Sequence, residues 1–454
     1  MRTGLLSITS VAMFAMIAAS LTAQPAAAPA APTVVLFQNV RIFDGTHGQL
    51  SAPSNVLVRG NKIEKISTAP IPTDRSAATQ IIEGNGRTLM PGLIDAHYHI
   101  IFESIPKLVA MTADIGYIYQ VAGRSSERTL MRGFTTVRDV GGPSFGLKRA
   151  IDEGVVLGPR IYPSGAFISQ TSGHGDFRMP DEVPRDIAAP LSYTERVGAA
   201  AIADGVPEVL LRTREQLRQG ASQIKLMAGG GVSSDFDPLD STQYSEEELH
   251  AAVEAAADWG TYVTVHAYTP RAIQRSIAAG VKCIEHGQLA DDATAKLMAE
   301  KGIWWSLQPF LDDEDLPQVP EGSSAHKNLL EMVAGTDNAY KLAKKYGVKT
   351  AFGTDALFDP KLAERQGNQL AKLVRWYTPA EVLKMATADN AELLALSGPR
   401  NPYPGKLGVV EEGALADLLL VDGDPIANIQ LITDPYTNFR IIMKDGTIYK
   451  NTLK

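Results

Sequence analysis

Both ends of the chain alternate apolar and polar residues in short runs separated by turn residues. Three such runs lie within residues 33–67, with Gly60-Asn61 as a hairpin turn, and the C-terminal runs ADLLLVDGDP and RIIMKDGTIYK have the same character. This alternation predicts short antiparallel strands. Because neither end alone holds enough strands for a stable sheet, we expect one small β-sandwich domain built from residues 33–88 and 396–454.

Between the two ends, short apolar runs alternate with longer helical stretches. One stretch, SEEELHAAVEAAADW, carries a capping pattern, with Ser245 as the cap and Glu248 three residues later. The strand candidates are LIDAHYH, TTVRDV, RIYPSGAFIS, QIKLMA, YVTVHA, KCIEH, IWWSLQP and KTAFGTDA. Eight strands that alternate with helices predict an α/β fold, a parallel (β/α)8 TIM barrel over residues 89–395.

The N-terminus has the character of a targeting segment. Arg2 precedes a mostly apolar run over residues 5–21, and an Ala/Pro-rich stretch follows. This order predicts a signal peptide over residues 1–23 and a spacer over 24–32, and therefore a periplasmic or secreted protein. A membrane anchor is the alternative, because the run is close to the ~18 residues that a spanning helix needs. We expect no stable membrane insertion after signal cleavage.

Composition narrows the classes of partner. The chain has 454 residues and a formal net charge of −8 without long acidic runs. It is long enough to bury a large core, and its charge argues against nucleic acid as a partner. Cys283 is the only cysteine. An exported chain with one thiol has no intramolecular disulfide, so its stability must come from packing or from bound metal.

Histidines and an aspartate stand at the ends of the predicted barrel strands. His97 and His99 end the first strand, His266 the fifth, His286 the sixth and Asp355 the eighth. Active sites form at the C-terminal mouth of such a barrel, so these side chains should converge in space. Because residues i and i+2 of a strand point to the same face, both imidazoles of the first strand can reach one metal ion.

Lys225 lies inside an apolar strand, between Ile224 and Leu226, so its side chain should point opposite to theirs, into the barrel. An ammonium group beside two dications would be repelled. Carboxylation by carbon dioxide would instead give a carbamate anion, whose two oxygens can bridge two metal ions. A salt-bridged or snorkelling lysine is the alternative for this position taken alone.

Asp355 and Arg138 are charged residues at the ends of predicted barrel strands. Asp355 can serve as metal ligand and as general base, accepting a proton from water and passing it to the leaving nitrogen. A helix cap is its structural alternative. Arg138 ends the second strand beside Asp139, where we expect it to form a structural ion pair.

Five segments, in this order, resemble the amidohydrolase superfamily: PGLIDAHYH, IKLMAGGGVSS, VTVHAYT, CIEHG and FGTDA. The likeness spans nearly all of the chain that follows the predicted signal peptide. Within the superfamily the chain looks like the binuclear-metal dipeptidase branch. That branch, also described as Xaa-Pro or imidazolonepropionase-like, includes Xaa-Lys/Arg enzymes of the carboxypeptidase type and ochratoxin-hydrolysing amidases.

The resemblance implies six ligands for two divalent metal ions, namely His97, His99, Lys225, His266, His286 and Asp355. The histidines of the first strand and the aspartate would hold the more buried ion, and the other two histidines the more exposed one. N-carboxylated Lys225 would bridge the ions together with a hydroxide. Zinc is the ion that such ligands suit best. The resemblance also implies a homo-oligomer.

Substrate recognition is predicted from a few further residues. The segment SQTSGHGDFR resembles part of this branch, and His174 within it would approach the substrate carboxylate or the scissile carbonyl. Tyr268 would donate its phenol hydroxyl to the developing oxyanion, and Arg178 is a candidate for binding the substrate carboxylate. Loop support and core packing are the structural alternatives for His174 and Tyr268. The acidic run 312–315 would attract a basic substrate side chain or, more simply, form a solvated surface loop.

These features predict a metal-dependent amidohydrolase. It would cleave the amide bond of a dipeptide, an N-acyl amino acid or an ochratoxin-type aryl amide with a metal-bridging hydroxide. A deaminase on the same barrel is the first alternative, although Thr269 stands where single-metal deaminases of the superfamily often carry glutamate. A lactonase or phosphotriesterase is the second. A non-catalytic binding protein on a degenerate barrel is the third, but such proteins usually lose metal ligands.

Overall fold

The structure is a computed structural model whose described residues are 33–74, 79–182, 190–234, 236–316 and 319–453. Residues 33–454 form one compact unit. The predicted signal peptide and spacer lie outside the described residues, so export stays a prediction. None of the helices in the described part of the chain combines the length and the apolar character needed to cross a membrane.

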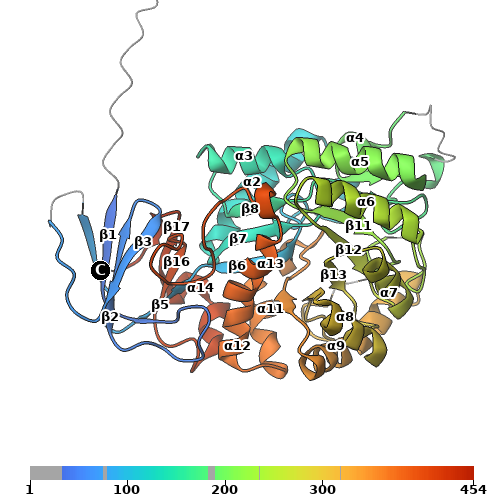
Figure 1. Ribbon diagram of the computed structural model, residues 1–454. Coiled ribbons are helices and arrows are strands. Elements are labelled where there is room, and N and C mark those ends of the chain that lie inside the picture. Colours follow the sequence, from blue (N-terminus) through green and yellow to red (C-terminus); the bar gives the residue numbers. More distant parts are fainter. Residues whose placement is uncertain (1–32, 75–78, 183–189, 235, 317–318, 454) are drawn as a thin grey trace, which may run out of the picture. The chain divides into compact units, whose positions relative to one another are not determined.

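Strands from both chain ends share one eight-stranded sheet, with β1–β3 beside β16 and β17 in Figure 1. Its order is β18-β17-β16-β5-β1-β2-β3, and β4 pairs with β1. The strands are β1 (Val34–Ile42), β2 (Ser54–Arg59), β3 (Lys62–Ser67), β4 (Thr79–Glu83), β5 (Thr88–Pro91), β16 (Leu418–Val421), β17 (Phe439–Lys444) and β18 (Thr447–Asn451).

The pairing within this sheet departs from the prediction in two respects. The predicted strands pair antiparallel, and the predicted hairpin at Gly60-Asn61 joins β2 to β3. However, β1 also pairs in parallel with β4 and β5, so the sheet is mixed. It includes Thr88–Pro91, past the expected boundary at residue 88. The β-sandwich arrangement stays a prediction.

The middle of the chain forms parallel strands only, which confirms an α/β fold with a parallel sheet. One ladder joins three strands and a second joins seven, in the order β10-β9-β11-β12-β13-β14-β15. The strands are β6 (Leu93–Tyr98), β7 (Phe134–Asp139), β8 (Arg160–Pro163), β9 (Phe167–Ser169), β10 (Ala200–Ile202), β11 (Ile224–Met227), β12 (Val263–Ala267), β13 (Cys283–His286), β14 (Trp304–Leu307) and β15 (Thr350–Phe352).

The segment RIYPSGAFIS, predicted as one strand, is divided into β8 and β9. Gly165 lies between them in a left-handed conformation, with a φ of 74°. A Cβ there would lie 2.3 Å from Gln216 Oε1, an acceptor for the backbone N–H of Ala166. The chain therefore turns at this glycine and passes from the three-stranded ladder to the seven-stranded one.

Hydrogen bonds join the two ladders beside β15 and beside β11, and each place includes one between backbone groups. The backbone N–H of Asp355, just after β15, donates to the carbonyl of His97 in β6 at 2.8 Å. The N–H of Ser222, just before β11, donates to the carbonyl of Pro163 in β8 at 2.7 Å. No strand ladder runs across either edge in the part of the chain that the structure describes. A closed (β/α)8 barrel therefore stays a prediction.

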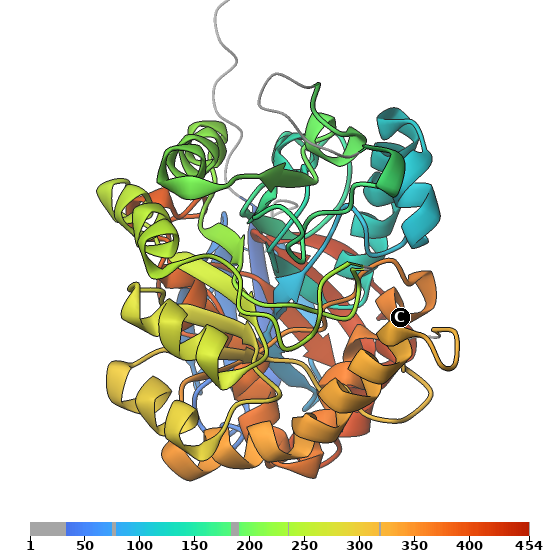
Figure 2. The same ribbon diagram turned by 90° about the vertical axis from the view of Figure 1, so that its right-hand side faces the viewer.

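Helices surround these strands, as Figure 2 shows. Ser245 and Glu248 form the predicted capping box at the start of α6. The helices are α1 (Lys107–Thr112), α2 (Ile115–Met131), α3 (Phe145–Asp152), α4 (Tyr193–Arg196), α5 (Gly205–Gln219), α6 (Glu246–Asp258), α7 (Pro270–Ala278), α8 (Asp292–Lys301), α9 (Ser324–Tyr346), α10 (Pro360–Ala363), α11 (Gln366–Lys372), α12 (Pro379–Lys384), α13 (Asn390–Ala395) and α14 (Pro435–Asn438).

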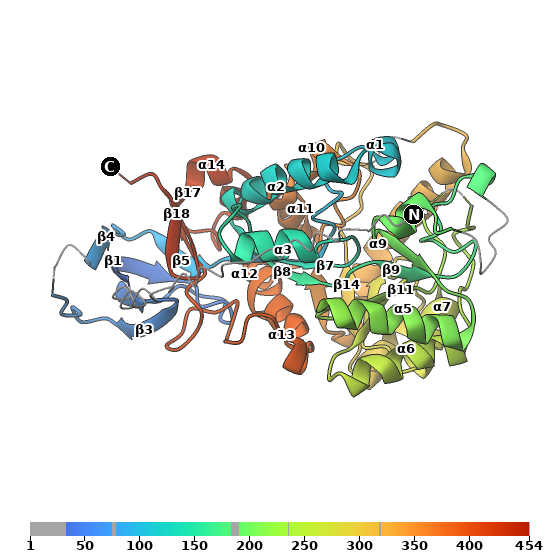
Figure 3. The same cartoon turned by 90° about the horizontal axis from the view of Figure 1, so that it is seen from above.

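The parallel strands and the mixed sheet share part of their core. Seen from above, β1, β3 and β18 lie at one end and β9, β11 and β14 at the other (Figure 3). One hydrophobic cluster contains Phe134 and Trp305 from the parallel strands together with Leu419 and Phe439 from the mixed sheet. This common core stabilises the base of the parallel strands and leaves their C-terminal ends for other roles.

Candidate metal centre

The structure brings all six predicted metal ligands to one cavity of about 660 Å³ at the C-terminal ends of the parallel strands. They are His97 at the end of β6, His99 just after it, Lys225 in β11, His266 in β12, His286 in β13 and Asp355 after β15. Five of them are at most 5% exposed. The volume lies within the usual range of small-molecule sites.

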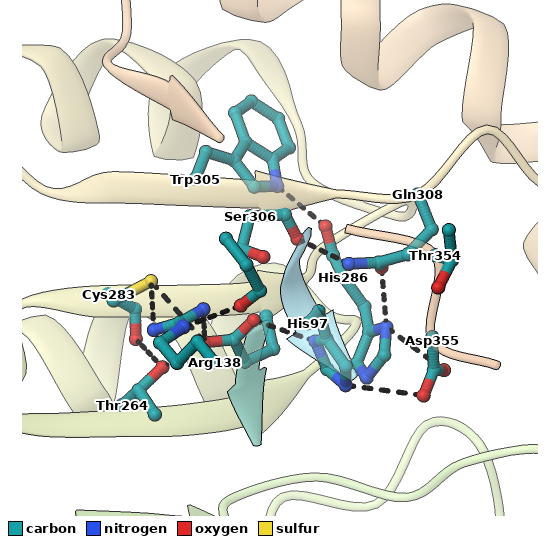
Figure 4. A network of polar contacts seen from close by, with 12 residues as sticks. His97, Arg138, Thr264, Cys283, His286, Trp305, Ser306, Gln308, Thr354 and Asp355 are labelled. Atoms are coloured by element: carbon teal, nitrogen blue, oxygen red, sulfur yellow. Dashed lines mark hydrogen bonds and ion pairs between the residues drawn. The ribbon is translucent and has the colours of Figure 1, made fainter. Parts of the chain in front are cut away.

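The Asp355 carboxylate lies beside the imidazoles of His97 and His286, as Figure 4 shows. Its Oδ1 is 3.2 Å from the Nε2 atoms of both His97 and His99, and its Oδ2 is 3.9 Å from His286 Nδ1. Two atoms that bind one tetrahedral zinc ion at 2.0–2.1 Å are roughly 3.3 Å apart. The spacing of Asp355 Oδ1 from the Nε2 atoms of His97 and His99 therefore fits a shared metal ion, whereas His286 Nδ1 faces Gln308. The rings of His266 and His286 lie nearby, with centroids 4.5 Å apart.

One nitrogen of each imidazole faces an acceptor from the surrounding protein. The acceptors are Glu285 for His97, Gly141 for His99, Gly230 for His266 and Gln308 for His286, at 2.7, 3.0, 3.0 and 2.8 Å. When the hydrogen of the neutral ring lies on that nitrogen, the other nitrogen keeps its lone pair. All four histidines are thus oriented with one nitrogen toward the surrounding protein and the other toward the cavity, as metal binding requires.

Two of the predicted ligands have left-handed backbone conformations. The φ angles of His286 and Asp355 are 72° and 52°. Such values cost a non-glycine residue of order 1–3 kcal/mol and are concentrated at functional sites. At His286 the conformation breaks the strand alternation, and both Glu285 and His286 consequently face the interior.

Lys225 is 1% exposed and lines the same cavity. Burial lowers its pKa, although the carboxylates of Glu285 and Asp355 act in the opposite direction. A lowered pKa favours the neutral amine, whose lone pair can attack carbon dioxide. The lysine therefore lies in the cavity with the other predicted ligands, and its carboxylation stays a prediction.

Glu285 is a site residue that the sequence interpretation missed. Its buried carboxylate accepts hydrogen bonds from His97 Nδ1 at 2.7 Å, from Arg138 Nη2 at 2.6 Å and from the Thr264 hydroxyl. Burial works to raise its pKa, but the charges of Arg138 and His97 outweigh burial and hold the pKa well below its usual range. The sequence held a clue to this role, because a charged glutamate inside the apolar strand KCIEH is as unusual as Lys225 inside its own apolar strand.

Arg138 forms a structural ion pair, as predicted, but its partner is Glu285. The guanidinium also donates to the carbonyl of Ala96 and, at 3.2 Å, to Tyr262 Oη. The neighbouring Asp139 instead accepts from the Ser144 hydroxyl at 2.7 Å. Arg138 therefore lies beneath the candidate metal centre as the counterion of the glutamate that orients His97.

Two of the three predicted substrate-binding residues line the cavity. His174 stacks on His266 with ring centroids 4.0 Å apart, and its Nδ1 lies 2.7 Å from Ser234 Oγ and 3.3 Å from Asp237 Oδ2. Tyr268 stacks on His286 at 5.1 Å and donates its hydroxyl to the weak acceptor Met332 Sδ at 3.2 Å. Both are thus close to the candidate metal ligands.

Arg178 is not among the described residues that line the cavity. Its Nε and Nη2 donate to the Asp176 carboxylate at 2.6 and 2.5 Å. Its predicted contact with a substrate carboxylate would require this buried pair to open.

The acidic run 312–315 is not simply solvated. Asp315 pairs with Arg365 and with Lys372 Nζ, and Lys372 Nζ also lies 2.8 Å from Asp313 Oδ2. Glu314 lies 2.6 Å from Arg365 Nη2. Arg365 precedes α11 and Lys372 ends it, so three of the four acidic residues of the run pair with two cations at the ends of this helix.

Comparison with known proteins identifies the family and its relatives. The pattern of the amidohydrolase family matches residues 88–451. Ochratoxinase from Aspergillus niger is 35% identical over 375 residues, which cover 80% of this chain and 75% of that protein.

Solved structures of an amidohydrolase and of a prolidase are also similar to this chain. The crystal structure of a prolidase complexed with N-methylphosphonate-L-proline is 34% identical, with a TM-score of 0.84, over 92% of this chain and 100% of that one. An amidohydrolase structure is 36% identical, with a TM-score of 0.83, over 93% of this chain and 100% of that one. The protein therefore belongs to the amidohydrolase family.

Proposed function

We propose that this protein hydrolyses the amide bond of a small peptide-like substrate with water activated by two divalent metal ions, most favourably zinc. One observation carries the proposal: four buried imidazoles, a carboxylate and a buried lysine meet at one cavity, and each imidazole has its outer nitrogen bonded to the protein. The names of the relatives, ochratoxinase and prolidase, are consistent with amide hydrolysis.

The donor set fits two ions better than one. Six donors exceed the usual four of a zinc site, and a carbamate on Lys225 would supply two oxygens between the ions. His97, His99 and Asp355 would hold one ion, and His266 and His286 the other. Two bound cations would polarise the scissile carbonyl and bring the pKa of a water close to neutral.

The residues of this chain would move and hold the protons. Burial works to raise the pKa of Asp355, but the neighbouring imidazoles, His97 first among them, hold that pKa well below its usual range, so its carboxylate is ionised. Its place among the candidate metal ligands is what suits it to act as the general base. Tyr268, whose hydroxyl now contacts only a thioether, can turn its donor to a developing oxyanion. His174 can orient the substrate from the face of His266.

The proposal is tested by metal content and product analysis together. The purified protein should hold close to two zinc ions per chain and release an amino acid from N-acyl amino acids or dipeptides. Lys225→Ala should lose most activity and part of the metal, and a short carboxylic acid should restore some activity. Full activity with two metal ions in Lys225→Ala would refute the carbamate. Ammonia release or lactone hydrolysis without amide hydrolysis would favour a deaminase or a lactonase.

A further inference from the structure

The edge between β6 and β15 carries candidate metal ligands on both of its sides. β6 holds His97 and leads to His99, and β15 leads to Asp355. Within the described ranges no ladder pairs these two strands, although the backbone N–H of Asp355 donates to the carbonyl of His97 at 2.8 Å. Side chains must therefore contribute to the distance between the ligands of the first strand and the ligand that follows the last strand.

Asn390, the first residue of α13, bridges one part of this edge. Its Nδ2 donates to the carbonyls of Ile94 in β6 and of Phe352 in β15, at 2.7 and 2.8 Å. Its Oδ1 accepts from the backbone N–H of Phe352 at 3.0 Å. These bonds join the two strands before either reaches its ligands, so the part of the edge that carries the ligands needs a support of its own.

Asp95 bridges that second part of the edge. Its Oδ1 accepts from the backbone N–H groups of His97 and of Thr354, both at 3.1 Å. Its Oδ2 accepts from the Thr354 hydroxyl at 2.7 Å and from Gln366 Nε2 at 3.0 Å. One carboxylate thus holds the backbone of His97 and the residue directly before Asp355.

The contacts of Asp95 leave it no capacity to bind a metal ion. A carboxylate offers about four lone-pair positions, and four hydrogen bonds from the protein occupy them. The side chain is fully buried and is not among the described residues that line the cavity. Its partner Gln366 is held in turn, because Gln366 Oε1 accepts from Arg132 Nε at 3.0 Å. Asp95 is therefore a support for the ligands rather than one of them.

The segment Gly353-Thr354-Asp355 is shaped to fit this edge. A Cβ built on Gly353 would lie 2.3 Å from the Cβ of His97 and 2.6 Å from its backbone nitrogen, so the chain approaches β6 as closely as only glycine permits. Asp355 has a φ of 52°, a conformation that persists only where the surroundings hold it. The two bonds from Thr354 to Asp95 lie directly before this residue and supply such a restraint.

From these contacts we infer that Asp95 is a positioning residue of the metal centre. Through His97 and Thr354 it sets the distance and direction between the ligands of the first strand and Asp355, without binding a metal ion itself. Glu285 orients one imidazole through its ring nitrogen, whereas Asp95 acts on the backbone on both sides of the edge. The inference rests on the proposed metal centre.

Two substitutions of Thr354 test the inference with cobalt(II) in place of zinc, because the visible absorption of cobalt(II) reports the geometry of its ligands. Thr354→Val removes the hydroxyl that donates to Asp95 and keeps the shape of the side chain. It should change the cobalt spectrum and lower kcat for an N-acyl amino acid at least about tenfold, with little change in KM. Thr354→Ser keeps the hydroxyl and should preserve both the spectrum and kcat.

Thr387→Val is the matched control. Thr387 is also fully buried, its hydroxyl donates to the carbonyl of Leu383 at 2.7 Å, and it does not line the cavity. Its substitution should lower the melting temperature about as much as Thr354→Val does and leave the cobalt spectrum and kcat unchanged. Asp95→Asn should lower metal affinity about 10–100-fold, as is typical of residues that hold ligands in place. Titration against a competing chelator measures this affinity.

The outcomes separate this inference from the proposed function. An unchanged cobalt spectrum in Thr354→Val, or an equal change in Thr354→Ser, would overturn the inference, because the bond to Asp95 would then not determine the ligand geometry. If the spectra respond as expected but the unsubstituted zinc enzyme cleaves no amide, the inference stands and the proposed function fails. If the unsubstituted protein binds no cobalt, both fail.

Discussion

At the residue scale, Glu285 shows how a buried charge can serve a metal site without touching the metal. It accepts hydrogen bonds from His97 on one side and from Arg138 and Thr264 on the other, and it is fully buried. Such a carboxylate keeps the hydrogen of His97 on the outer nitrogen and raises the basicity of the inner one. Arg138 in turn makes the buried anion tolerable.

Glu285→Gln should therefore weaken metal binding. The amide can keep part of the contact with His97, but it removes the negative charge and leaves Arg138 unpaired. We expect a loss of about 10–100-fold in metal affinity and of about 3–5 kcal/mol in the free energy of unfolding. Metal content after dialysis against a graded chelator, together with denaturant unfolding, measures both effects.

Thr264→Val is the matched control for this glutamate, because it removes one hydrogen bond to Glu285 and keeps both charges. Thr264→Val should lower the free energy of unfolding by about 1 kcal/mol and leave the metal content unchanged. If Glu285→Gln holds its metal as tightly as Thr264→Val does, the carboxylate has no role in orienting His97.

At the scale of the element, the loop after β11 holds the His174 ring close to its backbone, because Gly231 in this loop has no side chain. A Cβ built on Gly231 would lie 2.0 Å from His174 Cε1. The backbone of Gly231 also donates to Asp237 Oδ2 at 3.0 Å, and Asp237 in turn lies beside His174 Nδ1. The loop thus determines the position of the ring against His266 through close backbone approach.

Gly231→Ala should displace the His174 ring and lower kcat/KM at least about tenfold, since a misplaced substrate-positioning group is costly. Gly229→Ala, two residues earlier in the same loop, is the control, because its Cβ would meet only ordinary contacts of 3.4 Å or more. Steady-state kinetics of both variants, with metal content as a check, measure the difference. Equal activities would show that the position of His174 does not matter for turnover.

At the scale of the whole molecule, a buried arginine joins the parallel strands to the mixed sheet. Arg160, the first residue of β8, donates to both carboxylate oxygens of Asp417 at 2.8 and 3.1 Å and to Asp445 at 2.7 Å. Asp417 precedes β16, and Asp445 lies in the turn between β17 and β18. The charge pair therefore reinforces the shared hydrophobic core far from the cavity.

Arg160→Ala should destabilise the fold by about 3–5 kcal/mol, because it removes the guanidinium that pairs with the buried Asp417 carboxylate. Residual folded enzyme should keep its kcat/KM, since no cavity residue is changed. Arg149→Ala removes an exposed pair with Glu153 on α3 and should hardly change the melting temperature. Thermal unfolding followed by circular dichroism compares the two variants, and similar melting temperatures would contradict a role for Arg160 in joining the two parts.

The sequence by itself determined the alternation of strands and helices and the identity of the residues at the strand ends, because side-chain periodicity is a local property of the backbone. The six candidate ligands came from their places in the predicted strands together with the family resemblance, and the structure brings all six to one cavity. Only the tertiary structure decided that Glu285 pairs with Arg138 and that Gly165 divides one predicted strand into two. These features depend on contacts between residues far apart in the chain, which no local pattern encodes.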